Sequence, residues 1–240
     1  YSLTGTSKTG IVTTLTNTHT PEFTSISGTK TWNDADNQDG KRPESITVNL
    51  FADGTKLKSQ KVSADADGNW SYSFANLPKY VKGQEITYTV TEDAVDGYTT
   101  ESDGYNFINT HQPETTEITV TKTWDDADNQ DGKRPQDLTI TLMKNETVVV
   151  QTVILDAANN WTAKVENLAK NENGTPIRYS WVEGTMPEGY SLESTAVTDE
   201  KNSDDVVIGT ITTLTNTYAP GKVSASVKKV WDDANNQDGI

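Results

Sequence analysis

A lysine, a glutamate and an asparagine recur along this chain at nearly constant spacings. The three lysines each stand two residues before a tryptophan: Lys30, Lys122 and Lys229. The three asparagines each precede a threonine: Asn17, Asn109 and Asn216. Each asparagine lies thirteen positions before the next of these three lysines. An uncharged lysine amine can displace ammonia from an asparagine carboxamide, and a carboxylic acid can move the protons, so these residue types can form an amide cross-link.

Strands must position these groups, because apolar residues alternate with polar ones along most of the chain. The alternating segments are 46–51, 70–74, 86–92, 138–142, 148–155, 161–165 and 177–183. Alternate residues of a strand share a face, so Lys30 points inward if Trp32 is buried. In the same way Asn109 shares a face with Phe107, and Glu92 ends an alternating segment on its apolar side. Each unit therefore directs one lysine, one glutamate and one asparagine toward its own interior.

The second unit repeats this set as Lys122, Glu183 and Asn216. The lysine precedes the glutamate by 62 positions in the first unit and by 61 in the second. From the glutamate to the asparagine, however, the interval grows from 17 to 33 positions. We expect the additional residues, around 194–205, to form a surface loop, since loops tolerate length changes at small entropic cost. This insertion leaves the register of the strand that carries Asn216 open.

The residues alone allow two interpretations of each buried set. One is a lysine–glutamate ion pair whose remaining hydrogen bonds are satisfied by the asparagine, because a buried ammonium must be matched. The other is the amide bond. Burial lowers the pKa of a lysine and raises that of a glutamate, which favours a neutral amine beside a protonated acid. Glu92 and Glu183 would then promote the reaction, and proximity in a dry core would accelerate a single turnover.

Composition excludes several classes of function. The formal net charge is −15, from 35 acidic and 20 basic residues, which argues against nucleic acid and anionic membranes as partners. Cysteine is absent, so disulfides and thiolate metal sites are excluded. We expect the two histidines, His19 and His111, to be solvated at the start of linkers. No cofactor and no enzyme activity beyond self-modification is expected.

An acidic turn follows each tryptophan, at 34–40, 126–132 and 233–239. Oxygen ligands at alternate positions are what calcium prefers. The glycine stands seventh in each turn, however, whereas a calcium-binding EF-hand loop needs it sixth, and no glutamate closes a loop of twelve residues. Turns closed by Asp and Asn side chains explain the same residues without an ion. We therefore assign no metal site, and calcium remains the alternative for these turns.

The spacings divide the chain into four parts. Residues 24–111 and 116–218 are expected to be complete repeats, each close to the usual size of one domain. Residues 1–20 are expected to be the end of a preceding repeat, and 223–240 the start of a following one. Asn17 and Lys229 would then have their cross-link partners outside the chain, which we expect to be a window from a longer array.

Three phrases resemble the Cna protein B-type repeats of Gram-positive surface adhesins and pilins. They are Lys-Thr-Trp-Asn-Asp-Ala-Asp-Asn-Gln-Asp-Gly-Lys-Arg-Pro at 30–43, Tyr-Thr-Val-Thr-Glu at 88–92 and Ile-Asn-Thr at 108–110. The resemblance implies an all-β chain of tandem antiparallel β-sandwiches of inverse immunoglobulin-like topology. It also implies isopeptide bonds from Lys30 to Asn109, assisted by Glu92, and from Lys122 to Asn216, assisted by Glu183. The second unit departs from the first by carrying Trp181 where the first has Val90.

A structural stalk or pilus shaft on a Gram-positive cell surface is the expected function. Its location would be extracellular and attached to the cell wall, with the anchor outside this chain, and its partners would be the neighbouring repeats of the array. The alternative is a binding module that recognises a host protein or carbohydrate through its variable loops, chiefly residues 193–209. Host ligands bound by other regions of the whole protein are compatible with either function.

Overall fold

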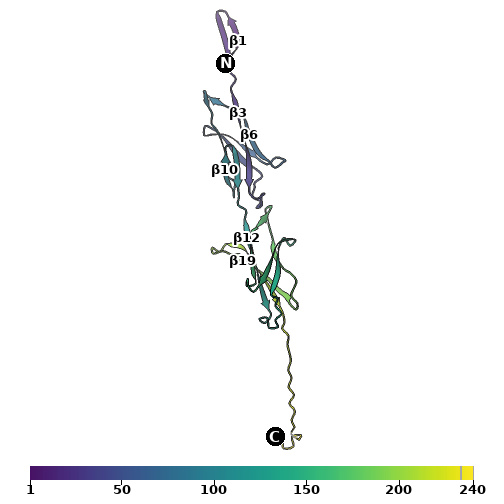
Figure 1. Cartoon of the computed structure of the whole chain (residues 1–240). Helices are drawn as coiled ribbons and strands as arrows, with labels where there is room; N and C mark the ends of the chain where they lie inside the picture. Colours follow the sequence, from purple (N-terminus) through teal and green to yellow (C-terminus); the bar gives the residue numbers. More distant parts are fainter. Residues whose placement is uncertain (233, 240) are drawn as a thin grey trace. The chain divides into compact units, whose positions relative to one another are not determined.

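Every regular element in the computed structural model is a β-strand, within the residues that it describes, 1–232 and 234–239 (Figure 1). Asp233 of the third acidic turn and Ile240 of the last partial repeat therefore lie outside the description. No helix in those residues is long and apolar enough to cross a membrane. The all-β fold expected from the alternation is confirmed.

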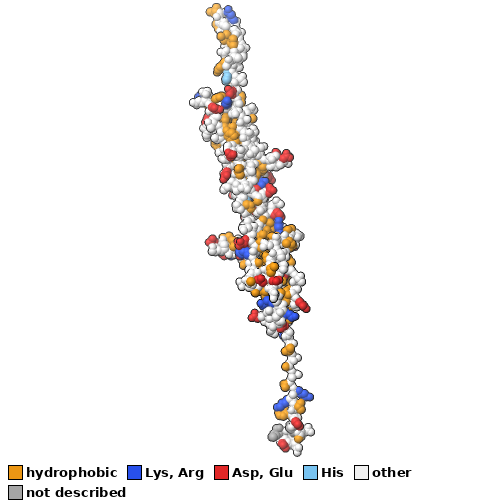
Figure 2. All heavy atoms as spheres, in the orientation of Figure 1, with side chains coloured by type: hydrophobic (Ala, Val, Ile, Leu, Met, Phe, Trp, Pro, Cys, Tyr) orange, Lys and Arg blue, Asp and Glu red, His pale blue; other side chains and the backbone are white. Residues whose placement is uncertain are grey.

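Two compact units make up the chain. The first contains Tyr1–Glu114 together with Ala169–Pro176, and the second contains Thr115–Leu168 together with Ile177 onward. On the face that Figure 2 shows, carboxylates are scattered over both units and are not gathered into one patch.

The first unit is a sandwich of two sheets. Its strands are β3 (Phe23–Asn33), β4 (Ile46–Ala52), β5 (Thr55–Val62), β6 (Trp70–Pro78), β9 (Tyr88–Glu92), β10 (Thr99–Asp103) and β11 (Asn106–Thr110). One sheet has the order β10-β11-β3-β6 and the other the order β5-β4-β9. All pairings are antiparallel except that of β3 with β11, which is parallel. The first and last strands of the sandwich are therefore direct neighbours.

Three two-stranded hairpins lie outside these two sheets, and the third of them is within residues 169–176. They are β1 (Ser2–Thr9) with β2 (Val12–Thr18), β7 (Tyr80–Val81) with β8 (Gln84–Glu85), and β16 (Asn171–Glu172) with β17 (Thr175–Pro176). The β1–β2 hairpin corresponds to the expected end of a preceding repeat, and most of its side chains are exposed.

The second unit has the same two-sheet arrangement. Its strands are β12 (Thr115–Asp125), β13 (Asp137–Lys144), β14 (Val148–Asp156), β15 (Thr162–Ala169), β18 (Tyr179–Glu183), β19 (Ser191–Lys201) and β20 (Val207–Thr217). One sheet has the order β15-β12-β20-β19 and the other the order β14-β13-β18. The first and last strands, β12 and β20, again pair in parallel.

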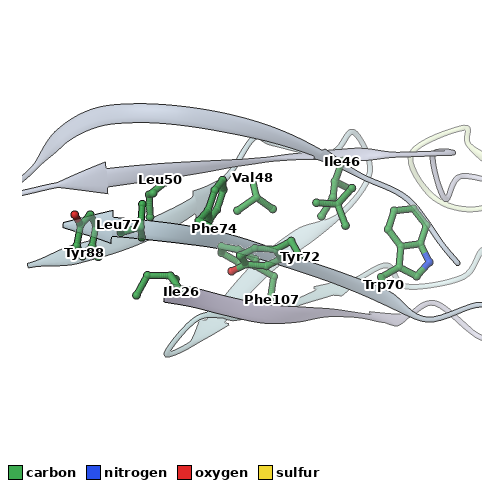
Figure 3. Close-up of a cluster of buried hydrophobic side chains, with 11 residues drawn as sticks. Ile26, Ile46, Val48, Leu50, Trp70, Tyr72, Phe74, Leu77, Tyr88 and Phe107 are labelled. Carbon is green, nitrogen blue, oxygen red and sulfur yellow. The ribbon is translucent and has the colours of Figure 1, made fainter. Parts of the chain in front are cut away.

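Alternating side chains fill the space between the sheets of each unit. Figure 3 draws this core in the first unit, where β4 and β6 contribute alternate residues: Ile46, Val48, Leu50, Trp70, Tyr72 and Phe74. Leu138, Ile140 and Leu142 of β13 have the corresponding role in the second unit. Burying one such side chain contributes about 2 kcal/mol. The predicted alternation is thus the pattern that builds both cores.

The insertion in the second unit is a longer hairpin, so the expectation of a loop was wrong. Strands β19 and β20 contain eleven residues each, whereas β10 and β11 contain five each. The hairpin ends in a turn closed by Asn202, whose Oδ1 accepts the N–H groups of Asp204 and Val206. The additional residues satisfy their backbone N–H and C=O groups by pairing with each other, whereas the same groups in a polar loop would need water as their partner.

Register near the asparagine is unchanged by this insertion. Lys30 lies opposite Phe107 in the first unit, and Lys122 lies opposite Leu214 in the second. In both units the asparagine lies two residues further along, opposite the tryptophan. The longer hairpin therefore extends away from the lysine and asparagine, and both units present them identically.

Candidate functional site

Three strands bring the lysine, the glutamate and the asparagine of the first unit together. Lys30 on β3 and Asn109 on β11 belong to neighbouring strands of one sheet. Glu92 is the last residue of β9, which belongs to the opposite sheet. The carboxylate therefore reaches the other two residues across the core, and the set forms only when the two sheets pack.

The contacts in the first unit are short and shielded from water. Glu92 Oε2 lies 3.2 Å from Lys30 Nζ, and the side chains of both residues have no exposed surface. Asn109 Nδ2 donates a hydrogen bond of 2.7 Å to Glu92 Oε1, and Asn109 is also fully buried. One carboxylate thus contacts both the amine and the carboxamide.

The second unit brings its own three residues together in a slightly different way. Lys122 Nζ lies 3.6 Å from Glu183 Oε1, and Asn216 Nδ2 donates to the same oxygen at 2.6 Å. Lys122 Nζ also donates to the carbonyl oxygens of Thr123 and Leu214, at 3.2 and 3.1 Å. Met186 adds a contact that the first unit lacks, because its Sδ accepts from Asn216 Nδ2 at 3.2 Å.

Burial disfavours the positively charged form of both lysines. It lowers the pKa of Lys30, and the Glu92 carboxylate opposes that shift only in part. In the second unit burial lowers the pKa of Lys122 to about 8, again against the opposing effect of Glu183. Removing a charge from water is costly in a dry core. Both amines are therefore closer to the neutral, nucleophilic form than an exposed lysine is.

Some buried polar atoms at the two sites have no hydrogen-bond partner. They are Asn109 Oδ1, Asn216 Oδ1 and Glu183 Oε2. Lys30 Nζ and Glu92 Oε2 also lack a well-oriented hydrogen bond, although they form an ion pair with each other at 3.2 Å. A half-turn about the Cβ–Cγ bond of the asparagine exchanges its Nδ2 and Oδ1. A protonated glutamate could then donate to the carboxamide oxygen over the same short distance. Buried polar atoms without a hydrogen-bond partner are rare and costly. Their presence here is what we expect of groups that exchange protons with one another.

A tryptophan ring covers each lysine amine. The Trp32 ring centroid lies 4.4 Å from Lys30 Nζ, and the Trp124 centroid lies 4.6 Å from Lys122 Nζ. Trp70 packs edge-on against Trp32 at 5.3 Å between ring centroids. The aromatic rings exclude water from the amine.

Asp34 of the acidic turn is buried, which the sequence interpretation missed. It is 2% exposed, and its carboxylate accepts two hydrogen bonds from Arg42, at 2.6 and 3.0 Å, and one from the Tyr98 hydroxyl at 2.8 Å. The N–H of Asn37 also donates to it, as expected for a turn closed by an aspartate side chain. Continuing the alternation of Lys30 by two further steps to Asp34 would have identified it as inward-facing.

The buried carboxylate of the first acidic turn is bonded to protein groups. The Asp34 oxygens are already bonded to Arg42, and the described residues contain no group of three or more His, Cys, Asp or Glu side chains placed to hold a metal ion. Residues 35–37 instead form a left-handed turn, with φ between 49° and 61°. This turn brings Asp34 and Arg42 into contact.

The last aspartate of the turn, Asp39, holds the segment that leaves the first unit. Its carboxylate accepts the N–H of Glu114 and contacts His111 Nε2, both at 2.8 Å. His111 Nδ1 lies 2.8 Å from the carbonyl oxygen of Gly97, and its side chain is only 9% exposed. The expectation that His111 is solvated was therefore wrong, because the turn folds back over it.

The residues of the two partial repeats are not assembled into sites. Asn17 lies on β2 and is exposed. Lys229 is also exposed, in a segment outside any strand, although its Nζ lies 3.2 Å from the centroid of the Trp231 ring. The lysine–tryptophan contact therefore forms locally, whereas the contact with glutamate and asparagine requires a complete sandwich.

Comparisons with known proteins identify a family and several similar chains. The model of the Cna protein B-type domain family matches residues 26–110 and 118–217. The collagen adhesin of Staphylococcus aureus is 45% identical over 225 residues, which are 94% of this chain and 18% of that protein. The chain therefore spans less than a fifth of the length of this relative.

Two crystal structures of B repeat units of the collagen-binding surface protein of Staphylococcus aureus are also similar. The single B1 unit is 43% identical with a TM-score of 0.36, and the match covers 83% of this chain and 100% of that one. The B1B2 pair is 43% identical with a TM-score of 0.40, and the match covers 86% of this chain and 52% of that one.

Proposed function

Since this chain belongs to the Cna protein B-type domain family, we propose that its two sandwich units are stalk modules of a bacterial surface protein, each closed by an amide bond that forms by itself between lysine and asparagine. The observation that carries the proposal is the fully buried contact of Lys30, Glu92 and Asn109. Its repetition in the second unit supports the same role for Lys122, Glu183 and Asn216.

The reaction exchanges one carbon–nitrogen bond for another. The neutral Nζ of Lys30 attacks Cγ of Asn109, the bond from Cγ to Nδ2 breaks, and ammonia leaves. Glu92 donates its proton to the carboxamide oxygen as the amine adds, and it then carries a lysine proton to the departing nitrogen. As ammonia leaves and the carbonyl re-forms, the oxygen returns its proton to Glu92. The glutamate ends as it began, and no cofactor is consumed. Each site reacts once, so the module is not an enzyme in the ordinary sense.

The core provides the conditions that this reaction needs. A proton moved from the lysine to the glutamate converts the ion pair into a neutral amine and a neutral acid, and burial favours that neutral pair. Neighbouring strands hold the amine and the carboxamide together, so little entropy is lost on reaching the transition state. The tryptophan over the amine keeps water from solvating the charged form.

The bond would join the first strand of each sandwich to the last. Pulling force that enters along β3 would pass through the amide to β11, and the chain between Lys30 and Asn109 would carry little of it. Closing so long a loop also reduces the entropy of the unfolded chain, as a disulfide does, by roughly 4 kcal/mol. Both effects suit a stalk that holds a surface protein away from the cell.

A cell-surface location follows from this role. The similar adhesin of Staphylococcus aureus is a surface protein of a Gram-positive bacterium, and we infer a wall-attached location for the protein to which this chain belongs. The repeats at 24–111 and 116–218 would act as successive modules, with neighbouring repeats as their partners. Asn17 and Lys229 would form the same bond with residues of adjoining repeats.

Intact mass measurement tests the cross-links directly. The purified chain should be lighter than its sequence mass by two ammonia equivalents, and peptide mapping should find Lys30 joined to Asn109 and Lys122 joined to Asn216. The chain isolated in denaturant before folding is the control and should have the full sequence mass. A folded chain with the full mass would return the site to the simple ion-pair interpretation.

A ligand-binding role for the β19–β20 hairpin is the second candidate. This hairpin exposes Val197, Val206 and Val207, which are 62%, 56% and 51% exposed. The corresponding hairpin of the first unit, β10–β11, is shorter. Saturable binding of a host protein or glycan to the whole chain, lost when the hairpin is shortened, would favour this candidate. If shortening the hairpin does not change binding, the hairpin is only a structural extension of the sheet.

A further inference from the structure

An ion pair lies along the same strand face as the reactive lysine. Residues 30, 32 and 34 alternate inward from β3 into the acidic turn, so Lys30, Trp32 and Asp34 face the same interior. Arg42 bonds to both oxygens of Asp34, and its guanidinium carbon lies 5.6 Å from the centroid of the Trp32 ring. Trp32 is therefore in contact with two cations, the lysine amine and the guanidinium.

The second unit reproduces this arrangement closely. Arg134 bonds to both oxygens of Asp126, at 2.6 and 2.9 Å, and its guanidinium carbon lies 5.9 Å from the Trp124 ring centroid. The Tyr190 hydroxyl donates to Asp126 at 2.8 Å, as Tyr98 does to Asp34. Residues 34–42 and 126–134 have the same sequence, and both units place the same charged cluster beside the lysine.

We propose that the Asp34–Arg42 pair, and Asp126–Arg134 in the second unit, are positioning residues for the cross-link, which hold the tryptophan over the amine and keep the net charge beside that amine near zero. The proposal rests on the proposed function, because it concerns the rate of the same reaction. Neither residue is expected to touch the reacting atoms.

Charge balance matters because only one form of the lysine–glutamate pair can react. With one proton shared, the pair is either an ammonium beside a carboxylate or a neutral amine beside a neutral acid. A lone negative charge at Asp34 would stabilise the ammonium, and Asp34 does act on Lys30 in the direction that raises its pKa. Arg42 cancels that charge. Its guanidinium contacts the same Trp32 ring as the lysine amine, and the repulsion between the two positive charges disfavours the ammonium form.

The groups that face the site come from every element packed around it. Toward Lys30 and its glutamate they are Glu92 on β9, Asp34 and Arg42 at the turn, Tyr98 beyond β9, and Tyr72 on β6. Burial raises the pKa of Tyr72 to about 12, and that of Tyr98 still further, so both hydroxyls are neutral at working pH. The charges that act on the lysine are those of Glu92 and Asp34, and Arg42 pairs with the second of these.

The test measures the rate of ammonia loss against pH in the full chain. Chain recovered uncross-linked in denaturant is refolded by dilution at a series of pH values, and each unit is followed by mass and peptide mapping. The reactive pair holds one proton, so the rate should fall at high pH as that proton is lost. The second unit is the internal control for variants of the first.

Removing either member of the pair should have opposite effects. Arg42→Met leaves the charge of Asp34 unbalanced, so the first bond should form about tenfold more slowly and the high-pH fall should move up by about one pH unit. Asp34→Asn leaves Arg42 unbalanced, so that fall should move to lower pH and the rate should not decrease. The double variant Asp34→Asn with Arg42→Met should return close to the original profile.

These outcomes separate the proposal from a purely structural role. If the two single variants shift the profile in the same direction, or leave its pH dependence unchanged, the charge-balancing role is wrong. Should Arg42→Met fail to refold, the comparison of Asp34→Asn with the double variant decides, since neither leaves a buried carboxylate unpaired. If the unaltered chain loses no ammonia in either unit, the proposed function itself has failed.

Discussion

Glu92 contacts Lys30 from the opposite sheet of the sandwich, at 3.2 Å between Oε2 and Nζ. Lys30 and Asn109 are neighbours on one sheet through the parallel pairing of β3 with β11, but the acid that contacts both arrives only when the second sheet packs. The chemistry therefore depends on completed folding. An unfolded or half-folded chain holds the same three residues without the dry contact between them.

Replacing the glutamate should remove one bond at a time. In Glu92→Ala the amine and the carboxamide of the first unit lose their proton carrier, so the chain should lose one ammonia equivalent instead of two. The remaining bond should map to Lys122 and Asn216. Glu183→Ala is the reciprocal control, and full cross-linking in either variant would show that another group moves the protons.

Removing the reactive lysine should release the first unit to mechanical extension. Lys30→Met keeps a long apolar side chain in the core but cannot form the amide. Stretching single molecules of this variant should add one extension step of roughly 250 Å, because the 79 positions from Lys30 to Asn109 become extensible at about 3.3–3.6 Å per residue. The unaltered chain should lack the step. Its appearance there would contradict the force-bearing role even if the bonds are present.

Acid should weaken the second unit through Asp126. Hydrogen bonds from Arg134 hold the pKa of Asp126 at about 2, against the opposing effect of burial. Because the folded pKa lies below the unfolded value, near 4, the stabilisation is complete above about pH 4 and is lost as the pH falls toward 2, by on the order of 2 kcal/mol. Unfolding free energies across this range should fall less steeply in Asp126→Asn. Equal slopes in the two proteins would contradict this account of the turn.

Shortening the long hairpin should spare the second bond. Replacing residues 198–211 with Asn-Gly, a favoured two-residue hairpin turn, leaves Lys122 opposite Leu214 and Trp124 opposite Asn216. Ammonia loss from the second unit should therefore continue, although its melting temperature should fall with the lost pairing to β12. A version with Asn216→Ala is the control that cannot react. Failure of the shortened chain to cross-link, with the unit still folded, would show that the distant pairing controls the site.

Local patterns determined much of this protein. Alternation of side chains is a property of each strand by itself, so the inward faces of Lys30 and Asn109 and most strands could be predicted from their neighbours in sequence. The repeated spacing likewise identified the second site and the repeat character of the chain.

Long-range pairing decided what these patterns left open. Nothing local indicates that β3 pairs with β11 while Glu92 crosses from the opposite sheet, since strand order depends on which faces bury the most apolar surface together. Alternation indicates the inward face of Asp34, but its contacts with Arg42 and Tyr98 form only when the chain folds over the turn. The residues of the insertion likewise became strand by pairing with each other. The residues of the site could be predicted from one strand at a time, whereas their contacts with one another exist only in the packed sandwich.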